Sequence, residues 1–224
     1  MKSFRNLMVR FMIVGVTVFA MQAAAAEMTD PVQFIKERSK AVLSALDGKR
    51  EQVRQDPEIA QQIVRKELLP HIDVEYISKL VLGPHWRSAS EEQRVRFQEA
   101  FQSFLLNSYA QGLAEFTEDR LQVMPLRGEP NPRRTIVQTE VMRENGQSVP
   151  VAYTLHWTDN GWKLFDVIIE GISYVRNYRT DFNSEVEQKG LDSLIARLES
   201  NGVSKPGDAK PDAESAPEAE DAGQ

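Results

Sequence analysis

Residues 162–182 read WKLFDVIIEGISYVRNYRTDF, and the rest of the fold can be worked out from this stretch. Its first half alternates in the manner of a β-strand, which places three apolar side chains on one face: Phe165, Val167 and Ile169. Gly171 ends the alternation, and apolar residues then recur at helical spacing up to Phe182. Upstream, residues 159–161 read Asp-Asn-Gly, which is typical of a hairpin turn, so a partner strand is expected before them. The stretch predicts an antiparallel sheet that leads into a C-terminal helix, with an apolar sheet face that something must cover.

Helices are predicted for the first half of the domain. Asp30-Pro31 and Asp56-Pro57 each place a capping aspartate before a proline, which is a common helix start. Ser90 and Gln93 form a capping box that opens the longest helix, at about residues 91–116. This helix carries a heavy apolar stripe, formed by Phe97, Phe101, Phe104, Leu105, Tyr109, Leu113 and Phe116.

Strands are predicted for the second half, at residues 121–126, 135–143, 149–158 and 162–169, with turn residues between them. The third strand has one apolar face, formed by Val149, Val151, Tyr153, Leu155 and Trp157. We expect that face to point at the long aromatic helix. A last helix, interrupted at Gly190, completes the domain. Helices followed by a meander predict an α+β fold, with helices packed on one face of a curved, mainly antiparallel four-stranded sheet.

The N-terminal end of the chain differs from the domain. Residues 1–26 have the three parts of a secretory signal peptide: basic residues first, a short apolar run at 11–21, and Ala24-Ala25-Ala26 at the end. We therefore expect cleavage after export and a location in the periplasm. Residues 27–204 are predicted to form one domain, and because the chain has no cysteine, no disulfide supports it.

The C-terminal segment, residues 205–224, is rich in proline and acidic side chains and has no aromatic or β-branched residue. Such a segment cannot bury enough apolar surface to offset its ordering entropy, so a disordered acidic tail is predicted. The whole chain has a formal net charge of −6. A negative charge argues against binding to nucleic acid and against adhesion to anionic lipid surfaces.

Residues that could carry catalysis form no recognised constellation. The three histidines are His71, His85 and His156. They are not spaced as metal ligands, and no nucleophile motif is present, so we expect no metal and no resident cofactor. Asp166 lies in an otherwise apolar strand, with Glu170 four positions later, where a buried carboxylate could act as a general base. The alternative is structural, with both carboxylates paired to backbone donors or to Arg176 or Arg179 in the following helix.

Several segments together carry a resemblance to a known family. They are Trp162-Lys163, Asp166-Val167, Glu170-Gly171-Ile172-Ser173, Asn177-Tyr178-Arg179 and Phe182, with Gly83, Trp86-Arg87, Ala89-Ser90 and Gln93 upstream. In order and spacing these segments resemble the signature of the toluene-tolerance (MlaC) family of periplasmic phospholipid-binding proteins. The resemblance covers about Pro31 to Leu198 and leaves out both ends of the chain.

The resemblance implies a fold and a function. Proteins of this family are similar in having helices and a curved sheet that enclose an apolar cavity for phospholipid tails. This chain would then be a monomeric, non-enzymatic carrier in the periplasm, with a glycerophospholipid as its ligand. It would shuttle lipid between an outer-membrane lipoprotein–porin complex and an inner-membrane ABC transporter with its substrate-binding membrane subunit, and so help to maintain outer-membrane lipid asymmetry.

The lipid-binding residues expected on this basis lie on the long helix and on the third and fourth strands. They are Phe101, Phe104, Leu105, Tyr109, Leu113, Val151, Tyr153, Leu155, Phe165, Val167 and Ile169. Two other classes of protein remain open from the residues alone: a small-ligand isomerase or hydrolase with Asp166 or His156 as its base, and a structural periplasmic adaptor with a filled core.

Arginines near the sheet and the last helices are candidates for docking to acidic partners or for holding phosphate groups. They are Arg127, Arg133, Arg134, Arg176 and Arg179. The alternative for each of them is a solvated surface charge.

Overall fold

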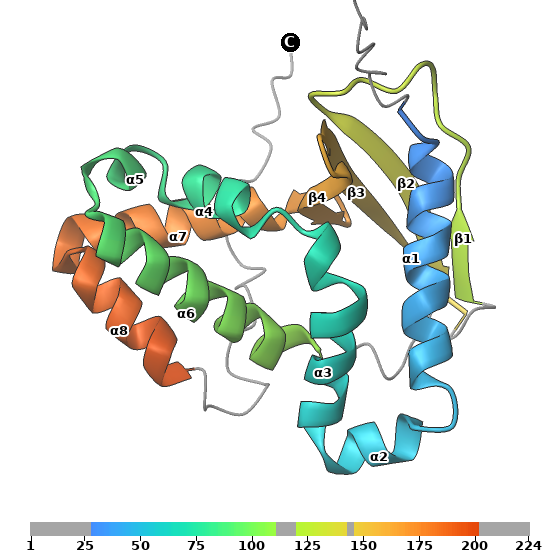
Figure 1. Ribbon diagram of the computed structural model, residues 1–224, viewed down its shortest axis with the longest axis horizontal. Helices are drawn as coiled ribbons and strands as arrows, with labels where there is room; N and C mark the ends of the chain where they lie inside the picture. The colour runs from blue at the N-terminus through green and yellow to red at the C-terminus, as the bar shows by residue number, and fades with distance from the viewer. Residues whose placement is uncertain (1–27, 111–119, 143–145, 202–224) are drawn as a thin grey trace, which may run out of the picture.

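The computed structural model describes residues 28–110, 120–142 and 146–201 (Figure 1). The signal peptide expected at residues 1–26 and the acidic tail expected at 205–224 lie outside these residues, as do Leu113 and Phe116. Within the described ranges, no helix is long and apolar enough to cross a membrane.

Three helices open the fold: α1 (Pro31–Leu46), α2 (Arg50–Gln55) and α3 (Pro57–Glu67). Both predicted helix starts are confirmed. The Asp30 carboxylate accepts a hydrogen bond of 2.8 Å from the N–H of Val32, and Asp56 caps α3 in the same way, at 3.0 Å. The sequence pattern does not predict α2, because this short helix buries little apolar surface of its own beyond Val53.

A second group of helical elements follows: the 3-10 turn η1 (Leu69–His71), α4 (Val74–Leu82), α5 (Pro84–Ser88) and α6 (Glu91–Tyr109). The predicted capping box of α6 is confirmed. The Ser90 hydroxyl accepts from the N–H of Gln93 at 3.1 Å, and the Gln93 side-chain carbonyl accepts from the N–H of Ser90 at 3.0 Å. The predicted extension of this helix towards residue 116 falls on residues 111–119, outside the described part.

The sheet has five strands in sequence order, each antiparallel to its neighbour: β1 (Leu121–Val123), β2 (Thr135–Met142), β3 (Ser148–Thr158), β4 (Gly161–Ile169) and β5 (Ile172–Ser173). The first four match the predicted strands. The sequence pattern misses β5, which has two residues and follows a two-residue turn. Glu170 and Gly171 both adopt positive φ angles, 51° and 85°, as a type I′ turn requires, so the chain folds back on β4 before the last helices begin.

A β-bulge in β4 changes which residues share a face of the sheet. The register skips one residue of β4, as the pairs Tyr153–Val167 and Leu155–Leu164 show. Phe165 is the extra residue, and it projects away from Val167 and Ile169 into the core formed by the helices. The expectation that Phe165 shares a face with Val167 and Ile169 is therefore wrong, because strict alternation does not allow for a bulge.

Two helices close the fold, α7 (Tyr174–Lys189) and α8 (Leu191–Asn201). Gly190 separates them with a φ of +83°, which L-residues rarely adopt, so the expected interruption is confirmed. The Arg197 guanidinium on α8 donates three hydrogen bonds of 2.6–3.0 Å to the Glu185 carboxylate on α7, which links the two helices.

Figure 1 shows that α1 lies across one face of the sheet, while α4, α6, α7 and α8 form a bundle beside it. The aromatic stripe of α6 packs inside this bundle; the ring centroids of Phe101 and Phe182, for example, are 5.6 Å apart. Among the described residues, the helical members of the cluster on the inward face of β3 are Val32 and Ile35 of α1, with Phe34 packed against them. The expectation that β3 faces the aromatic helix is therefore wrong, because α4, α7 and α8 already cover the aromatic side of α6.

Candidate functional site

The sheet face crossed by α1 carries two adjoining apolar clusters. The first cluster lies under the start of α1 and contains Leu155 and Trp162, packed with Val32 and Ile35. The Trp162 indole N–H donates to the carbonyl of Thr29 at 2.7 Å, which holds the chain before α1 against the sheet. With Leu155 0% and Trp162 2% exposed, this part of the face is closed protein core.

The second cluster, called the strand cluster below, is built from the strands. Its members are Val141, Val149 and Val151, with Leu121, Tyr153, Val167 and Ile169 packed against them. Pairing across the sheet explains the cluster, since Val151 lies opposite Thr139 on one side and Ile169 on the other. In the described part of the chain no helix residue belongs to it. An apolar surface of this kind requires an apolar partner.

Tyr153 joins the two clusters, because it packs against both. Burial raises the pKa of its phenol, and a hydrogen bond with the Thr139 side chain offsets part of that rise. Thr139 also donates from its hydroxyl to the carbonyl of Val151 at 2.9 Å. The hydroxyl groups of Tyr153 and Thr139 therefore form their hydrogen bonds within the sheet. The face of the sheet at the strand cluster remains apolar in character.

Part of the expected lipid-binding set comes together in the strand cluster: Val151, Tyr153, Val167 and Ile169. Leu155 lies beside them in the closed cluster, and Phe165 lies on the opposite face. Sequence reasoning missed Val141 as a member. The alternation of β2 contains the necessary signal, because Val141 has Val149 as its direct partner on β3.

The expected lipid-binding residues on α6 lie in or beside the helical bundle. Phe101 and Phe104 are buried in its core, and Leu105 packs against that core. Tyr109 is half-buried, and its hydroxyl oxygen lies 2.6 Å from that of Tyr178 on α7. These residues lie on α6, whereas the strand cluster lies on the sheet. The two regions of the fold are connected by β5 and the start of α7.

Asp166 fixes the start of α7 through hydrogen bonds. Its Oδ2 accepts from the Ser173 hydroxyl at 2.6 Å, and its Oδ1 accepts from the N–H of Val175 at 3.1 Å. Ser173 in turn caps the helix by accepting from the N–H of Arg176 at 3.1 Å. These contacts favour the structural interpretation of Asp166, with hydroxyl and backbone donors in place of the side chains of Arg176 or Arg179.

His156 lies on the face of the sheet opposite to the strand cluster, between two aromatic rings. Its ring centroid is 4.8 Å from that of Tyr76 and 5.2 Å from that of Phe165. Its Nε2 is 3.0 Å from Oδ2 of Asp73 but out of line for a hydrogen bond, so the contact is an ion pair only when the imidazole is protonated. Among the residues that the structure describes, no group of three or more His, Cys, Asp or Glu could hold a metal ion.

Comparison with known proteins places these features in a family. The family model described as MlaC protein matches residues 36–200. The chain belongs to the MlaC family. This confirms the resemblance expected from the sequence.

Two curated relatives and one solved structure extend the comparison. The intermembrane phospholipid transport system binding protein MlaC of Haemophilus influenzae is 24% identical over 187 residues, which cover 82% of this chain and 87% of that protein. The toluene tolerance protein ttg2D of Pseudomonas putida is 28% identical over 188 residues, covering 84% and 86%. A phospholipid-binding protein from Ralstonia solanacearum, solved in complex with a phospholipid, matches with a TM-score of 0.71 at 24% identity, over 78% of this chain and 97% of that one. The last match confirms the α+β fold.

Much of the segment that resembles the MlaC signature serves to position α7. Asp166 and Ser173 hold its first turn, and Tyr178 contacts Tyr109 on α6. Arg179 lies against Gly83, and its Nε is 3.4 Å from the position that a Cβ atom on residue 83 would occupy. Gly83 has a φ of +52°, so a side chain there would be strained as well as crowded. The signature residues thus secure the helix that follows the strand cluster.

Proposed function

We propose that this member of the MlaC family is a phospholipid carrier that holds the acyl tails of a glycerophospholipid against the strand cluster. The observation that carries the proposal is the strand cluster itself, an apolar group on the sheet that, in the described part of the chain, has no helix residue among its members. An acyl chain is a flexible apolar partner that can follow such a surface. The name of the H. influenzae relative, an intermembrane phospholipid transport system binding protein, and the phospholipid in the solved neighbour support this choice of ligand.

The free energy of the tails explains why such a carrier needs a protein interior. Burial of one methylene contributes about 0.8 kcal/mol, so two tails of roughly 15 methylenes each would cost on the order of 24 kcal/mol to expose to water. The protein does not have to exceed a membrane by this amount, because the membrane offers the tails a similar apolar environment. Loading and unloading are then nearly balanced, and small changes on docking can set the direction.

We further propose that the carrier works in the periplasm as a monomer, without catalysis and without a metal or resident cofactor. Its route would run between an outer-membrane lipoprotein–porin complex and an inner-membrane ABC transporter with its substrate-binding membrane subunit. The signal peptide expected at residues 1–26 supports the location. The description of the H. influenzae relative as an intermembrane phospholipid transport protein supports the route.

Extraction of the purified mature protein with organic solvent, followed by mass spectrometry, tests the ligand. We expect phospholipid in roughly equimolar amount with the protein. A clean extract from a well-folded sample, with no uptake of lipid from vesicles, would contradict the proposal.

A matched pair of charged substitutions tests the place where the lipid binds. Val151→Glu puts a carboxylate in the strand cluster and is expected to remove most of the bound lipid. Ile136→Glu puts the same charge on the opposite face of the sheet, where Ile136 is 37% exposed, and is expected to leave the lipid in place. Far-UV circular dichroism checks the fold of both variants. Equal lipid contents in the two folded variants would remove the strand cluster from the site.

A further inference from the structure

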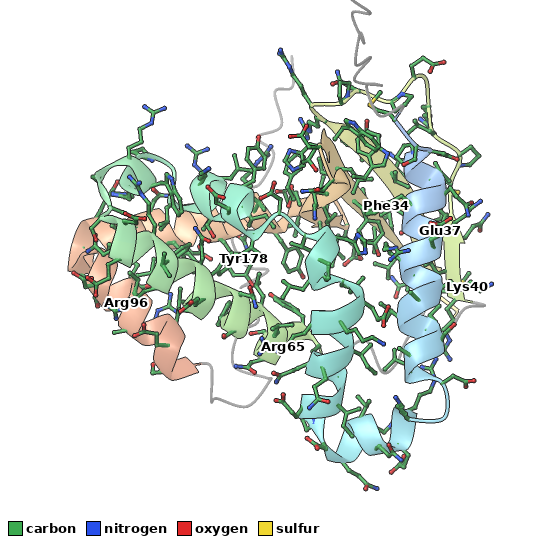
Figure 2. The ribbon with its side chains drawn as sticks, viewed as in Figure 1. Phe34, Glu37, Lys40, Arg65, Arg96 and Tyr178 are labelled. Atoms are coloured by element: carbon green, nitrogen blue, oxygen red, sulfur yellow. The ribbon has the colours of Figure 1, made fainter. Side chains whose placement is uncertain are left out.

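Two tyrosine hydroxyls meet between α6 and α7 in apolar surroundings. The oxygens of Tyr109 and Tyr178 are 2.6 Å apart. The ring of Tyr178 packs edge-on against Phe101 and Phe104, at centroid distances of 5.4 and 5.9 Å, and Figure 2 shows Tyr178 between α4 and α6. The ring of Tyr109 packs edge-on against Tyr174, at 5.7 Å.

The two hydroxyl groups carry two protons, and the hydrogen bond between Tyr109 and Tyr178 uses one of them. When one phenol donates to the other, the accepting oxygen still carries its own proton. Within the described residues, the hydrogen bond between Tyr109 and Tyr178 is the one that these hydroxyls make. The second proton is therefore available to an acceptor that arrives with a ligand.

The electrostatic surroundings favour a neutral acceptor. Burial raises the pKa of Tyr109 and the pKa of Tyr178, so both phenols stay protonated at physiological pH. Two carboxylates act on this region: Asp181 on Tyr178, and Glu170 on the neighbouring Tyr174. A phosphate would bring further negative charge near them, whereas a carbonyl oxygen accepts the hydrogen bond without bringing a charge.

The chain path connects the hydroxyl pair to the strand cluster. Ile169 belongs to that cluster and is paired with Ile172 of β5. Helix α7 begins with Tyr174 directly after β5, and Tyr178 follows one turn later. β5 therefore brings Tyr174, whose ring contacts that of Tyr109, next to the Ile169 end of the strand cluster.

From this arrangement we infer that the Tyr109–Tyr178 pair is a subsite for an ester carbonyl oxygen of the bound lipid. The inference rests on the proposed carrier function and narrows its substrate class to lipids with ester-linked tails. Glycerophospholipids carry their ester carbonyls where the glycerol meets the tails, next to the apolar part that the strand cluster takes. An ether-linked lipid of the same chain length has the same tails and head group but no such carbonyl.

Competition between two synthetic phosphatidylglycerols tests the subsite, one with ester-linked tails and the other with ether-linked tails of equal length. The wild-type mature protein is expected to prefer the ester lipid by roughly 2- to 10-fold, the range of one neutral hydrogen bond. In the double variant Tyr109→Phe/Tyr178→Phe both rings stay and both hydroxyls are removed, so the preference should fall to parity. Each single variant leaves one hydroxyl that can still donate, so Tyr178→Phe or Tyr109→Phe alone should keep part of the preference and serves as the second variant if the double variant does not fold. Tyr76→Phe on α4, whose ring packs against His156 and Phe165, should keep the preference.

Each other outcome has a distinct meaning. Equal binding of both lipids by the wild type would overturn the subsite and leave the carrier function intact. An equal loss of both lipids in the double variant would also overturn it, because the hydroxyls would then serve packing alone. Failure of the wild type to bind either lipid would instead remove the carrier function on which the subsite rests.

Discussion

Phe165 and Val167 are two residues apart on β4, yet their side chains project from opposite faces of the sheet. Residues at this spacing normally share a face, but the bulge at Phe165 turns its side chain to the other face of the sheet. Phe165, 8% exposed, packs with α4, α6 and α7, whereas Val167 is half-buried in the strand cluster. One strand therefore both attaches the helical bundle to the sheet and contributes to the apolar face proposed for the lipid.

Alanine substitutions at these two positions should have different effects. Phe165→Ala is expected to lower the free energy of unfolding by about 3–5 kcal/mol, because it leaves a cavity in the bundle core. Lipid per folded molecule should stay unchanged. Val167→Ala should cost roughly 1–2 kcal/mol and reduce the bound lipid, because it removes apolar surface from the strand cluster. Urea denaturation and lipid extraction measure the two effects, and loss of lipid in a fully stable Phe165→Ala variant would contradict the assignment.

Leu155→Arg should behave as a core substitution. Leu155 is fully buried and belongs to one cluster with Val32 and Ile35 of α1. An arginine there would overpack the core and bury an unpaired charge, at a cost of several kcal/mol. We expect insoluble or unfolded protein, whereas Val167→Arg, on the half-buried strand cluster, should yield folded protein with less lipid. A soluble, folded and lipid-free Leu155→Arg variant would show that the cavity extends under α1.

The sequence predicts the elements of this fold well because their signals are local. Capping residues such as Asp30, Asp56 and Ser90 act within one turn, and the hairpin signal at 159–161 acts within two strands. The apolar alternation of β3 likewise identifies its inward face. These features depend on backbone geometry within a few residues and can be read from a single sequence.

Features that depend on distant packing were predicted less well. The bulge at Phe165 and the two-residue strand β5 break the period that the prediction assumes. The helix that packs on β3 was also predicted wrongly. Both α1 and α6 are amphipathic, and no local signal indicates which of them faces β3. The contact of Tyr109 with Tyr178 joins residues 69 positions apart, so only the folded chain shows that the two hydroxyls meet.

Asp166→Ala should weaken the junction between β4 and α7. The substitution leaves the Ser173 hydroxyl and the N–H of Val175 without their acceptor, which is expected to cost about 1–3 kcal/mol of stability. Asp166→Asn keeps one carbonyl oxygen and should cost less. Glu187→Ala, an exposed carboxylate on the same helix, should change the stability little. Thermal unfolding measures the series, and equal melting temperatures for Asp166→Ala and Glu187→Ala would contradict the assigned role.

His71 should make the fold less stable in mild acid. Its Nε2 accepts a hydrogen bond from Arg38 at 2.9 Å, and burial together with the charges of Arg38 and Lys163 lowers its pKa from the usual value of 6.5. Between the lowered pKa and about 6.5, the unfolded chain binds more protons at this site than the folded chain, so stability falls as the pH falls through that window. His71→Gln keeps an acceptor for Arg38 without a titrating group. Urea denaturation between pH 7.5 and 5.5 should therefore show a smaller loss of unfolding free energy for His71→Gln than for the wild type. The same dependence of unfolding free energy on pH in both proteins would contradict the prediction.

Arg133 and Arg134 are two candidates for docking that lie on one hydrogen-bonded turn. The N–H of Arg133 donates to the Asn131 side chain at 2.9 Å, and the N–H of Arg134 donates to the Asn131 carbonyl at 3.1 Å, so the turn that carries them is fixed. Both side chains are exposed, and neither forms an ion pair with another described residue. A preorganised pair of cations on a net negative protein can steer it towards an acidic partner and set its orientation there.

Reversal of both charges, Arg133→Glu with Arg134→Glu, tests this role. If the pair serves docking, lipid transfer to reconstituted partner complexes should slow and lose much of its dependence on salt, while the amount of bound lipid stays the same. The control reverses two exposed cations elsewhere, Lys40→Glu on α1 with Arg65→Glu on α3, both labelled in Figure 2. The control matches the change in net charge, so a specific site requires the Arg133/Arg134 variant to slow transfer more than the control does. Equal transfer rates for the two double variants would leave net charge as the cause and remove this turn from the docking surface.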